Sequence, residues 1–172
     1  NLKDVAKVVI LRENCEDSKK VKRKIRKWIK RSRIFGDLVV IHMNAGLHDI
    51  KREFGAKQNQ VPLEEYKKNL PDILSIIREN TDAKIIWATT TPVIYDRHHK
   101  NKPMDRFEED VREYNKASVE IMKTEGIEID DLNSVIANDD VEKCILEDGV
   151  HMTERGNRLL VEKVTEVLKA HL

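Results

Sequence analysis

The stretch "DLVVIHMNAGLHDI", residues 37–50, joins a short apolar run to a polar turn, and this combination decides the fold. Residues 37–43 have the composition of a strand that is buried on both faces of a sheet. The "NAGLHD" that follows directly contains turn-forming residues and a histidine that can take part in proton transfer. The stretch therefore predicts a strand over 37–43 with a polar loop at its carboxyl end.

Similar apolar runs recur along the chain and alternate with helical patterns. Further strands are predicted over 5–11, 83–93 and 127–132. Amphipathic helices are predicted over 19–33, 61–80, 104–126 and 153–172. Pro71 should kink or divide the second helix, and "DRHHKNKP" (96–103) is predicted to be a polar loop. This alternation predicts one domain over 1–172, a flavodoxin-like α/β/α sandwich of three layers with a mostly parallel sheet.

The charge of the chain is unevenly distributed. The formal net charge is +1, yet residues 1–33 hold thirteen Lys and Arg against four Asp and Glu. Most of this excess lies on the predicted helix 19–33, whose apolar residues form a single stripe: Val21, Ile25, Trp28 and Ile29. The basic face is interpreted first as a solvated surface and second as a patch for an anionic partner. No base-reading motif or interleaved aromatic residues accompany it, which argues against nucleic acid.

Several classes of protein lack support in the sequence. No apolar run approaches the roughly 20 residues of a membrane span. Cys15 and Cys144 match no metal-binding or redox spacing, and two isolated cysteines are more typical of a reducing compartment. No cluster of His, Asp and Glu has the spacing of metal ligands. The sequence therefore predicts no membrane span, no metal and no organic cofactor.

A second stretch with acid–base potential is "DGVHMTERG", residues 148–156, just before the last predicted helix. Acyl-transfer enzymes use a His to move a proton and an Asp to orient that His, and Asp148 and His151 are spaced for such a pair. Parallel sheets bind ligands at the carboxyl ends of their strands. We therefore expect "NCEDS" (14–18), "NAGLHD" and "TTTPV" (89–93) at that edge, with Asp148 and His151 reaching it.

Each of these motifs also has a purely structural interpretation. An Asp and a His three residues apart are common in proteins, and "GLHD" (46–49) alone fits a turn. In that turn, Gly46 would meet a backbone requirement and Asp49 would cap a helix. Among the other histidines, His42 lies within a predicted strand and fits a core position. His98 and His99 lie in the predicted loop and should be solvated.

The order and spacing of "NCEDS", "GLHD" and "DGVH" (148–151) resemble the SGNH hydrolases, also called the GDSL esterase family. The resemblance covers essentially the whole chain, and it is closest to a branch with G-L-H-D in place of G-x-N-D. It implies a serine hydrolase that cleaves a small-molecule carboxylic ester or thioester with a short acyl group. It implies no cofactor.

The resemblance also implies a role for each matching residue. His151 would act as general base and acid, with Asp148 orienting its imidazole. His48 stands where most of the family has the Asn of the oxyanion hole, and a neutral imidazole N–H can donate in its place. Gly46 and Asn44 would support that loop. The backbone N–H of Glu16 would be a second oxyanion donor, at a position where the family usually has Gly.

The nucleophile of the family is absent from this sequence. It is the Ser of a G-D-S block directly after the first strand, and none of the five serines follows Gly-Asp. The resemblance places that block upstream of Asn1, on a strand central to the sheet. An upstream segment or a strand from a partner chain would then fill the gap. Alternatively, the sheet closes up and the chain is an inactive binding module that uses helix 19–33 for an anionic partner. A further alternative is that Cys15 replaces the serine.

Overall fold

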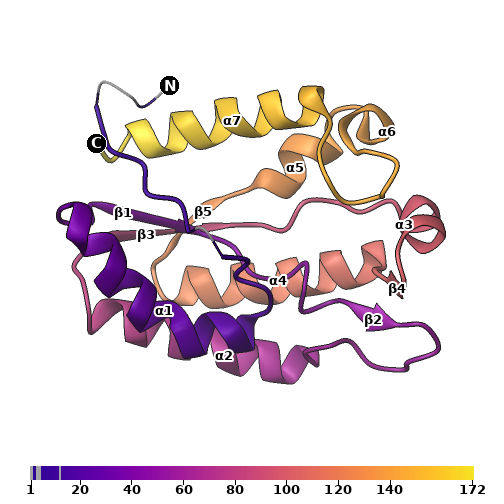
Figure 1. Cartoon of the computed structure of the whole chain (residues 1–172), viewed down its shortest axis with the longest axis horizontal. Coiled ribbons are helices and arrows are strands. Elements are labelled where there is room, and N and C mark those ends of the chain that lie inside the picture. Colours follow the sequence, from indigo (N-terminus) through magenta and orange to yellow (C-terminus); the bar gives the residue numbers. More distant parts are fainter. Residues whose placement is uncertain (1, 3–4, 12) are drawn as a thin grey trace.

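The computed structural model describes residues 2, 5–11 and 13–172 and shows a parallel sheet with helices on both faces (Figure 1). The sheet consists of β1 (Val40–Met43), β3 (Lys84–Ala88) and β5 (Glu128–Asp130), paired in that order and all parallel. The strands are shorter than their predicted ranges but lie within them. The predicted α/β class with a parallel sheet is confirmed.

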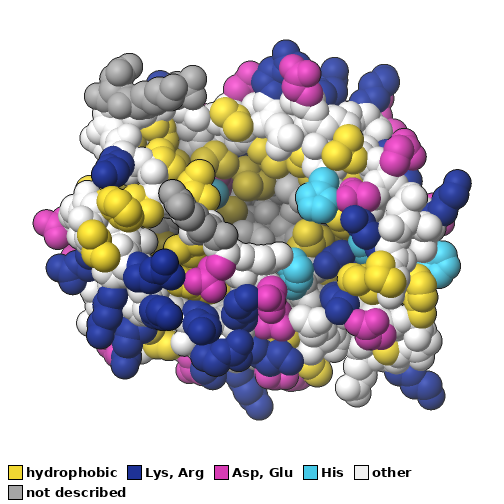
Figure 2. Space-filling model, in the orientation of Figure 1, with side chains coloured by type: hydrophobic (Ala, Val, Ile, Leu, Met, Phe, Trp, Pro, Cys, Tyr) yellow, Lys and Arg dark blue, Asp and Glu magenta, His cyan; other side chains and the backbone are white. Residues whose placement is uncertain are grey.

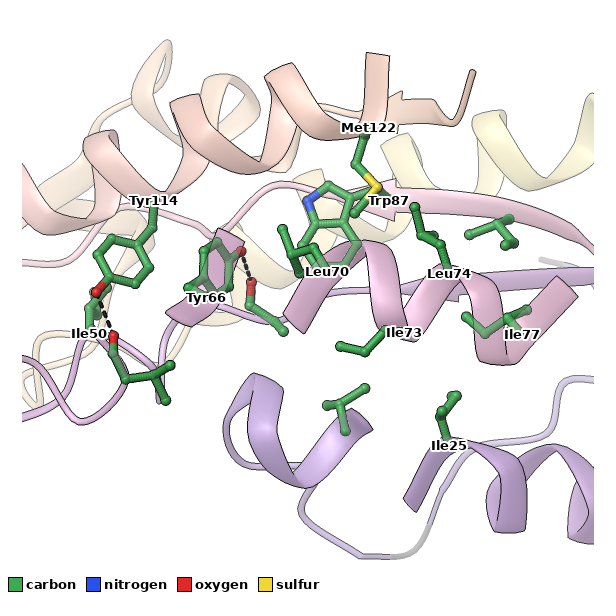
Figure 3. Close-up of a cluster of buried hydrophobic side chains, with 14 of the residues drawn as sticks. Ile25, Ile50, Tyr66, Leu70, Ile73, Leu74, Ile77, Trp87, Tyr114 and Met122 are labelled. Atoms are coloured by element: carbon green, nitrogen blue, oxygen red, sulfur yellow. Dashed lines mark hydrogen bonds between the residues drawn. The ribbon is translucent and has the colours of Figure 1, made fainter. Parts of the chain in front are cut away.

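One face of the sheet is covered by three long helices, α1 (Ser18–Ser32), α2 (Leu63–Arg78) and α4 (Glu108–Thr124). The α1 helix begins where the Asp17 side chain accepts the Lys20 N–H, and its predicted apolar stripe is buried. The α2 helix is not divided at Pro71, because the residues around the proline are anchored in the core. Figure 3 shows Leu70 and Leu74 of α2 and Met122 of α4 around the fully buried Trp87.

The other face carries α7 (Glu154–Lys169), together with the short helices α5 (Leu132–Ala137) and α6 (Val141–Cys144) (Figure 1). Thr153 caps α7, because its side chain accepts the Gly156 N–H. At one end of the molecule, β2 (Arg52–Glu53) and β4 (Met104–Asp105) form a small antiparallel ribbon. The turn η1 (Arg33–Phe35) follows α1.

Two predicted elements are wrong. The strand predicted over 5–11 does not form, and Val8 and Ile10 are 58% and 79% exposed there. A strand needs a neighbour to pair its N–H and C=O groups, and this segment has none among the described residues. The loop predicted over 96–103 is instead largely helix α3 (Tyr95–Asn101).

The sheet has an open edge along β1. The Lys84 N–H donates to Val39 O over 2.8 Å, so the parallel ladder turns the backbone groups of Ile41 and Met43 towards β3. Those of Val40 and His42 then point the other way. Within the described residues β1 pairs with β3 alone, so the sheet has not closed up. Figure 2 shows a hollow on this side of the molecule with hydrophobic side chains gathered in it.

The basic face of α1 lies on the surface, where Lys and Arg side chains gather in Figure 2. Part of its charge is balanced by acidic residues of α2 and its C-cap, through Lys22–Asp72 at 2.6 Å and Arg26–Glu79 at 3.1 Å. These pairs are solvent-exposed, so each stabilises the fold by about 1 kcal/mol at most. The face is therefore solvated in the way that the first interpretation expected.

Candidate active site

Asp148 and His151 form the hydrogen-bonded pair that their spacing predicts. Asp148 Oδ1 accepts the backbone N–H groups of Val150 and His151 at 3.1 and 3.0 Å, and Oδ2 accepts from His151 Nδ1. Lys102 Nζ lies 3.2 Å from Oδ2. Partial burial raises the pKa of Asp148, but these hydrogen bonds outweigh it and hold the pKa well below its usual range. Asp148 is therefore an anion at neutral pH, and it fixes the ring of His151.

The Asp148–His151 turn is fixed against α3. Gly149 has a φ of +76°, and a Cβ there would lie 2.5 Å from Ile94 O and 2.6 Å from His98 N, so only glycine fits. The Ile94 N–H donates to Gly149 O over 2.9 Å, and Asn101 Nδ2 donates to Glu147 O over 2.7 Å. This anchoring leaves the His151 side chain 71% exposed, with its second ring nitrogen accessible.

The "GLHD" loop is held against the strand β3 and the loop that follows it. Asn44 Nδ2 donates to Ala88 O over 2.7 Å. A Cβ at Gly46 would collide with Thr90 Oγ1, so this close approach requires glycine. Asn44 and Gly46 thus support the loop, and they bring "NAGLHD" beside "TTTPV" at the carboxyl edge of the sheet, where both were expected.

Asp49 joins the "GLHD" loop to "NCEDS". Its carboxylate is fully buried and accepts the Ser18 N–H at 3.0 Å and the Ser18 hydroxyl at 2.5 Å. It therefore caps α1 from a distant part of the chain, as the structural interpretation of this motif suggested. Burial raises the pKa of Asp49 to about 6, against the opposing effect of the Ser18 hydrogen bonds.

The two candidate oxyanion donors differ in how free their N–H groups are to bind an oxyanion. His48 is half-buried, and burial followed by the nearby Arg106 charge lowers its pKa, which favours the neutral imidazole. Glu16 has a φ of +52°, the left-handed conformation that glycine adopts most easily, so a glycine would occupy this position without strain. Its N–H donates to Asn14 Oδ1 over 2.8 Å in this structure, so an oxyanion would have to displace that oxygen.

Two buried residues of the site were missed by the sequence analysis. Arg106 is only 6% exposed and donates from Nε to Leu47 O over 2.6 Å. Its Nη1 lies 3.0 Å from His98 Nε2, and His98 Nδ1 lies 3.1 Å from Asp148 O. The solvated position predicted for His98 is wrong, because the residue is fully buried. No periodicity or motif marks either residue, since their contacts join segments far apart in the sequence.

The remaining candidates have structural roles. His42 Nε2 lies 2.8 Å from the buried Asp130 carboxylate, which confirms the near-core position expected for it. His99 is half-exposed and pairs with Asp105 at 2.7 Å. Cys15 packs at the edge of the main core, and burial raises the pKa of its thiol, which disfavours the thiolate that a nucleophile needs.

Most serine hydroxyls of this chain bond elsewhere. Four of them donate to neighbours other than His151, namely those of Ser18, Ser75, Ser118 and Ser134.

Among the described residues, no group of three or more His, Cys, Asp or Glu could hold a metal ion. Within residues 2, 5–11 and 13–172, no helix has the length and apolar character needed to cross a membrane.

Comparison with known proteins identifies the family. Residues 10–159 match the model of the GDSL-like lipase/acylhydrolase family. The chain belongs to this family. Among curated proteins it is 28% identical over 116 residues to the GDSL esterase/lipase WDL1 of Oryza sativa subsp. japonica. That match covers 63% of this chain but only 45% of the rice protein.

Solved structures of a lipase/acylhydrolase and an acetyl xylan esterase share the fold. The lipase/acylhydrolase from Enterococcus faecalis superimposes with a TM-score of 0.69 and 18% identity, over 90% of this chain and 71% of that one. The acetyl xylan esterase AlAXEase gives a TM-score of 0.69 and 12% identity, over 90% and 77% of the two chains. At these identities the likeness concerns the fold alone.

Proposed function

We propose that this GDSL-family chain carries the acid–base half of a Ser-His-Asp esterase site. The observation that carries the proposal is the Asp148–His151 pair. The carboxylate fixes the Nδ1–H side of the ring, and the exposed side is free to take a proton from a serine. His151 acts first as general base and then as general acid towards the leaving group.

The oxyanion donors of the proposed site come from two loops. His48 donates from its neutral ring, and the backbone N–H of Glu16 donates once Asn14 Oδ1 has moved aside. Asn44 and Gly46 hold the His48 loop at the carboxyl edge of the sheet. The G-L-H-D sequence thus replaces an amide donor by an imidazole donor, which works only while His48 is neutral.

The proposed nucleophile is a serine on a strand that these 172 residues do not contain. The open edge of β1 supports this, because the backbone groups of Val40 and His42 point away from β3. A strand parallel to β1 at that edge would end beside the "NAGLHD" loop. The hollow in Figure 2 lies on the same side of the molecule. A further segment of the same protein or a second chain could supply the strand.

The proposed substrate is a carboxylic ester or thioester with a short acyl group. The acetyl xylan esterase among the structural relatives supports a short acyl group. No ion pair or metal is needed to bind such a substrate, because the reaction relies on a polarised carbonyl and a proton shuttle.

The proposal is tested with a fluorophosphonate probe and peptide mapping on the protein expressed from its complete gene. The expected result is one adduct, on a serine outside residues 1–172, which forms at least about 1000-fold more slowly in His151→Ala. The matched control is His171→Ala, the histidine after the other end of α7, which should label normally. Full ester hydrolysis in His151→Ala would overturn the acid–base role. An adduct on a serine within 1–172 would overturn the missing-strand proposal.

A further inference from the structure

Arg106 and His98 connect the two loops of the proposed site. Arg106, just before α4, donates to Leu47 O, the residue before His48. His98, in the middle of α3, contacts the backbone of Asp148. The contact of 3.0 Å between Arg106 Nη1 and His98 Nε2 joins these two interactions into one continuous bridge.

The bridge fixes the protonation state of His98. A guanidinium can only donate, so His98 Nε2 must accept, and the ring proton must be on Nδ1. That proton then donates to Asp148 O, 3.1 Å away. Burial, with the adjacent Arg106 charge, lowers the pKa of His98, which agrees with a neutral ring. The structure thus selects one tautomer of His98 out of the possible forms.

Buried Arg106 lacks a direct ion-pair partner among the described residues, and the Asp148 carboxylate acts on it only from beyond ion-pair distance. Buried guanidinium groups are normally paired with a carboxylate. In the described part of the chain, no carboxylate lies within ion-pair distance of Arg106, and its contacts are a backbone carbonyl and a neutral imidazole. Such a buried cation is costly to the fold, which favours a functional reason for it.

We propose that Arg106 and His98 are positioning residues of the esterase site, which hold the His48 loop and the Asp148–His151 turn in register. The Arg106 charge has a second effect, since it adds to the burial that lowers the pKa of His48 and so favours a neutral ring that can donate. The bridge acts through Asp148 and His48 and does not itself touch the substrate. This inference rests on the proposed function for its catalytic meaning, but its geometry can be measured without any activity.

The first measurement is the tautomer of His98, by long-range ¹H–¹⁵N NMR at neutral pH on the protein expressed from its complete gene. The expected result is a neutral ring with its proton on Nδ1. A charged ring, or one with its proton on Nε2, would overturn the bridge.

The second measurement compares His98→Gln with His98→Leu. The glutamine amide can donate to Asp148 O while its oxygen accepts from Arg106, whereas leucine has a similar volume and does neither. The downfield Nδ1 proton of His151 should persist in His98→Gln and broaden or disappear in His98→Leu. If His98→Leu does not fold, Arg106→Met replaces it, because it removes the buried charge instead of leaving it unpaired. An unchanged His151 proton in the leucine or methionine variant would contradict the proposal.

The kinetic measurement separates positioning from general stability. His98→Leu should lower kcat for a short-chain ester by about 10- to 100-fold with little change in KM, and His98→Gln should stay within about 3-fold of the natural protein. Equal loss in both variants would contradict a positioning role. If the natural protein hydrolyses no ester at all, the proposed function fails, while the NMR results still decide whether the bridge exists.

Discussion

The two faces of the sheet differ sharply in how well they are packed. On one face, α2 buries six side chains, and Trp87 of β3 is fully buried beside it. On the other, the 16-residue helix α7 buries only Gly156, and Val161 is 57% exposed. An amphipathic helix of this length normally buries a continuous stripe. The α7 face is therefore the less well packed of the two, as expected if the strand proposed beside β1 also packs against it.

The largest expected effect is in amide hydrogen exchange of the two neighbouring strands. The Ile86 N–H lies within the sheet and should exchange only on global unfolding. The Val40 and His42 amides face the open edge and should exchange on the order of 1000-fold faster in the 172-residue chain. Exchange is followed by NMR or by mass spectrometry of peptides covering β1 and β3.

The same experiment distinguishes an empty edge from a filled one. In the protein expressed from its complete gene, a strand seated beside β1 should slow the Val40 and His42 amides towards the rate of Ile86. Equal and slow exchange of all three amides in the 172-residue chain would contradict the open edge itself.

The next largest effect compares the same substitution on the two faces. Leu74→Ala empties a fully buried site and should cost about 3 to 4 kcal/mol of unfolding free energy. Leu168→Ala, on the half-buried side of α7, should cost about 1 kcal/mol or less. Both are measured by denaturant unfolding of the same chain. A cost at Leu168 equal to that at Leu74 would mean that α7 is as well packed as α2.

The sequence predicted the buried residues of the well-packed face better than it predicted the strand over 5–11. The stripe Val21, Ile25, Trp28 and Ile29 is buried as predicted, because a helical period reports directly on burial. Segment 5–11 has the composition of a strand, but composition does not provide the neighbour that a strand must pair with. The predicted strand therefore failed for a reason outside the local sequence.

The candidate site was predicted in its local parts and missed in its long-range ones. Asp148 and His151 are three residues apart, so their pairing is a short-range property that spacing reveals. Helix α3 depends on tertiary bonds, such as Arg97 to Ile145 O at 2.7 Å. The Arg106–His98 contact likewise exists only once α3, α4 and two loops have come together. Sequence patterns carry no signal for contacts of that kind.

The third largest effect is the pH dependence of stability that comes from Asp49, which lies on the well-packed face. Its pKa rises from 3.8 to about 6 on folding, so the folded state binds the proton more tightly than the unfolded state. This contribution to stability is therefore fully present below pH about 3.8 and is lost as the pH rises through about 6. The loss should be about 2 to 3 kcal/mol.

Asp49→Asn isolates this contribution, because asparagine does not titrate. The unfolding free energy of the natural chain minus that of Asp49→Asn should fall between pH 4 and 6 and level off above it. The subtraction is necessary because the lowered pKa of Asp148 acts in the opposite direction over a lower pH range. A difference that rises with pH would show that the Ser18 hydrogen bonds outweigh burial at Asp49.

The smallest effect is expected on the basic face of α1, where the alternative function as an inactive binding module would act. Lys27 and Lys30 are exposed, so Lys27→Glu with Lys30→Glu should change stability by less than about 0.5 kcal/mol. Any binding to duplex DNA or anionic vesicles should be weak and disappear by about 150 mM salt, because it involves only solvated charges. Binding that persists at that salt and is lost in the double variant would favour the binding module.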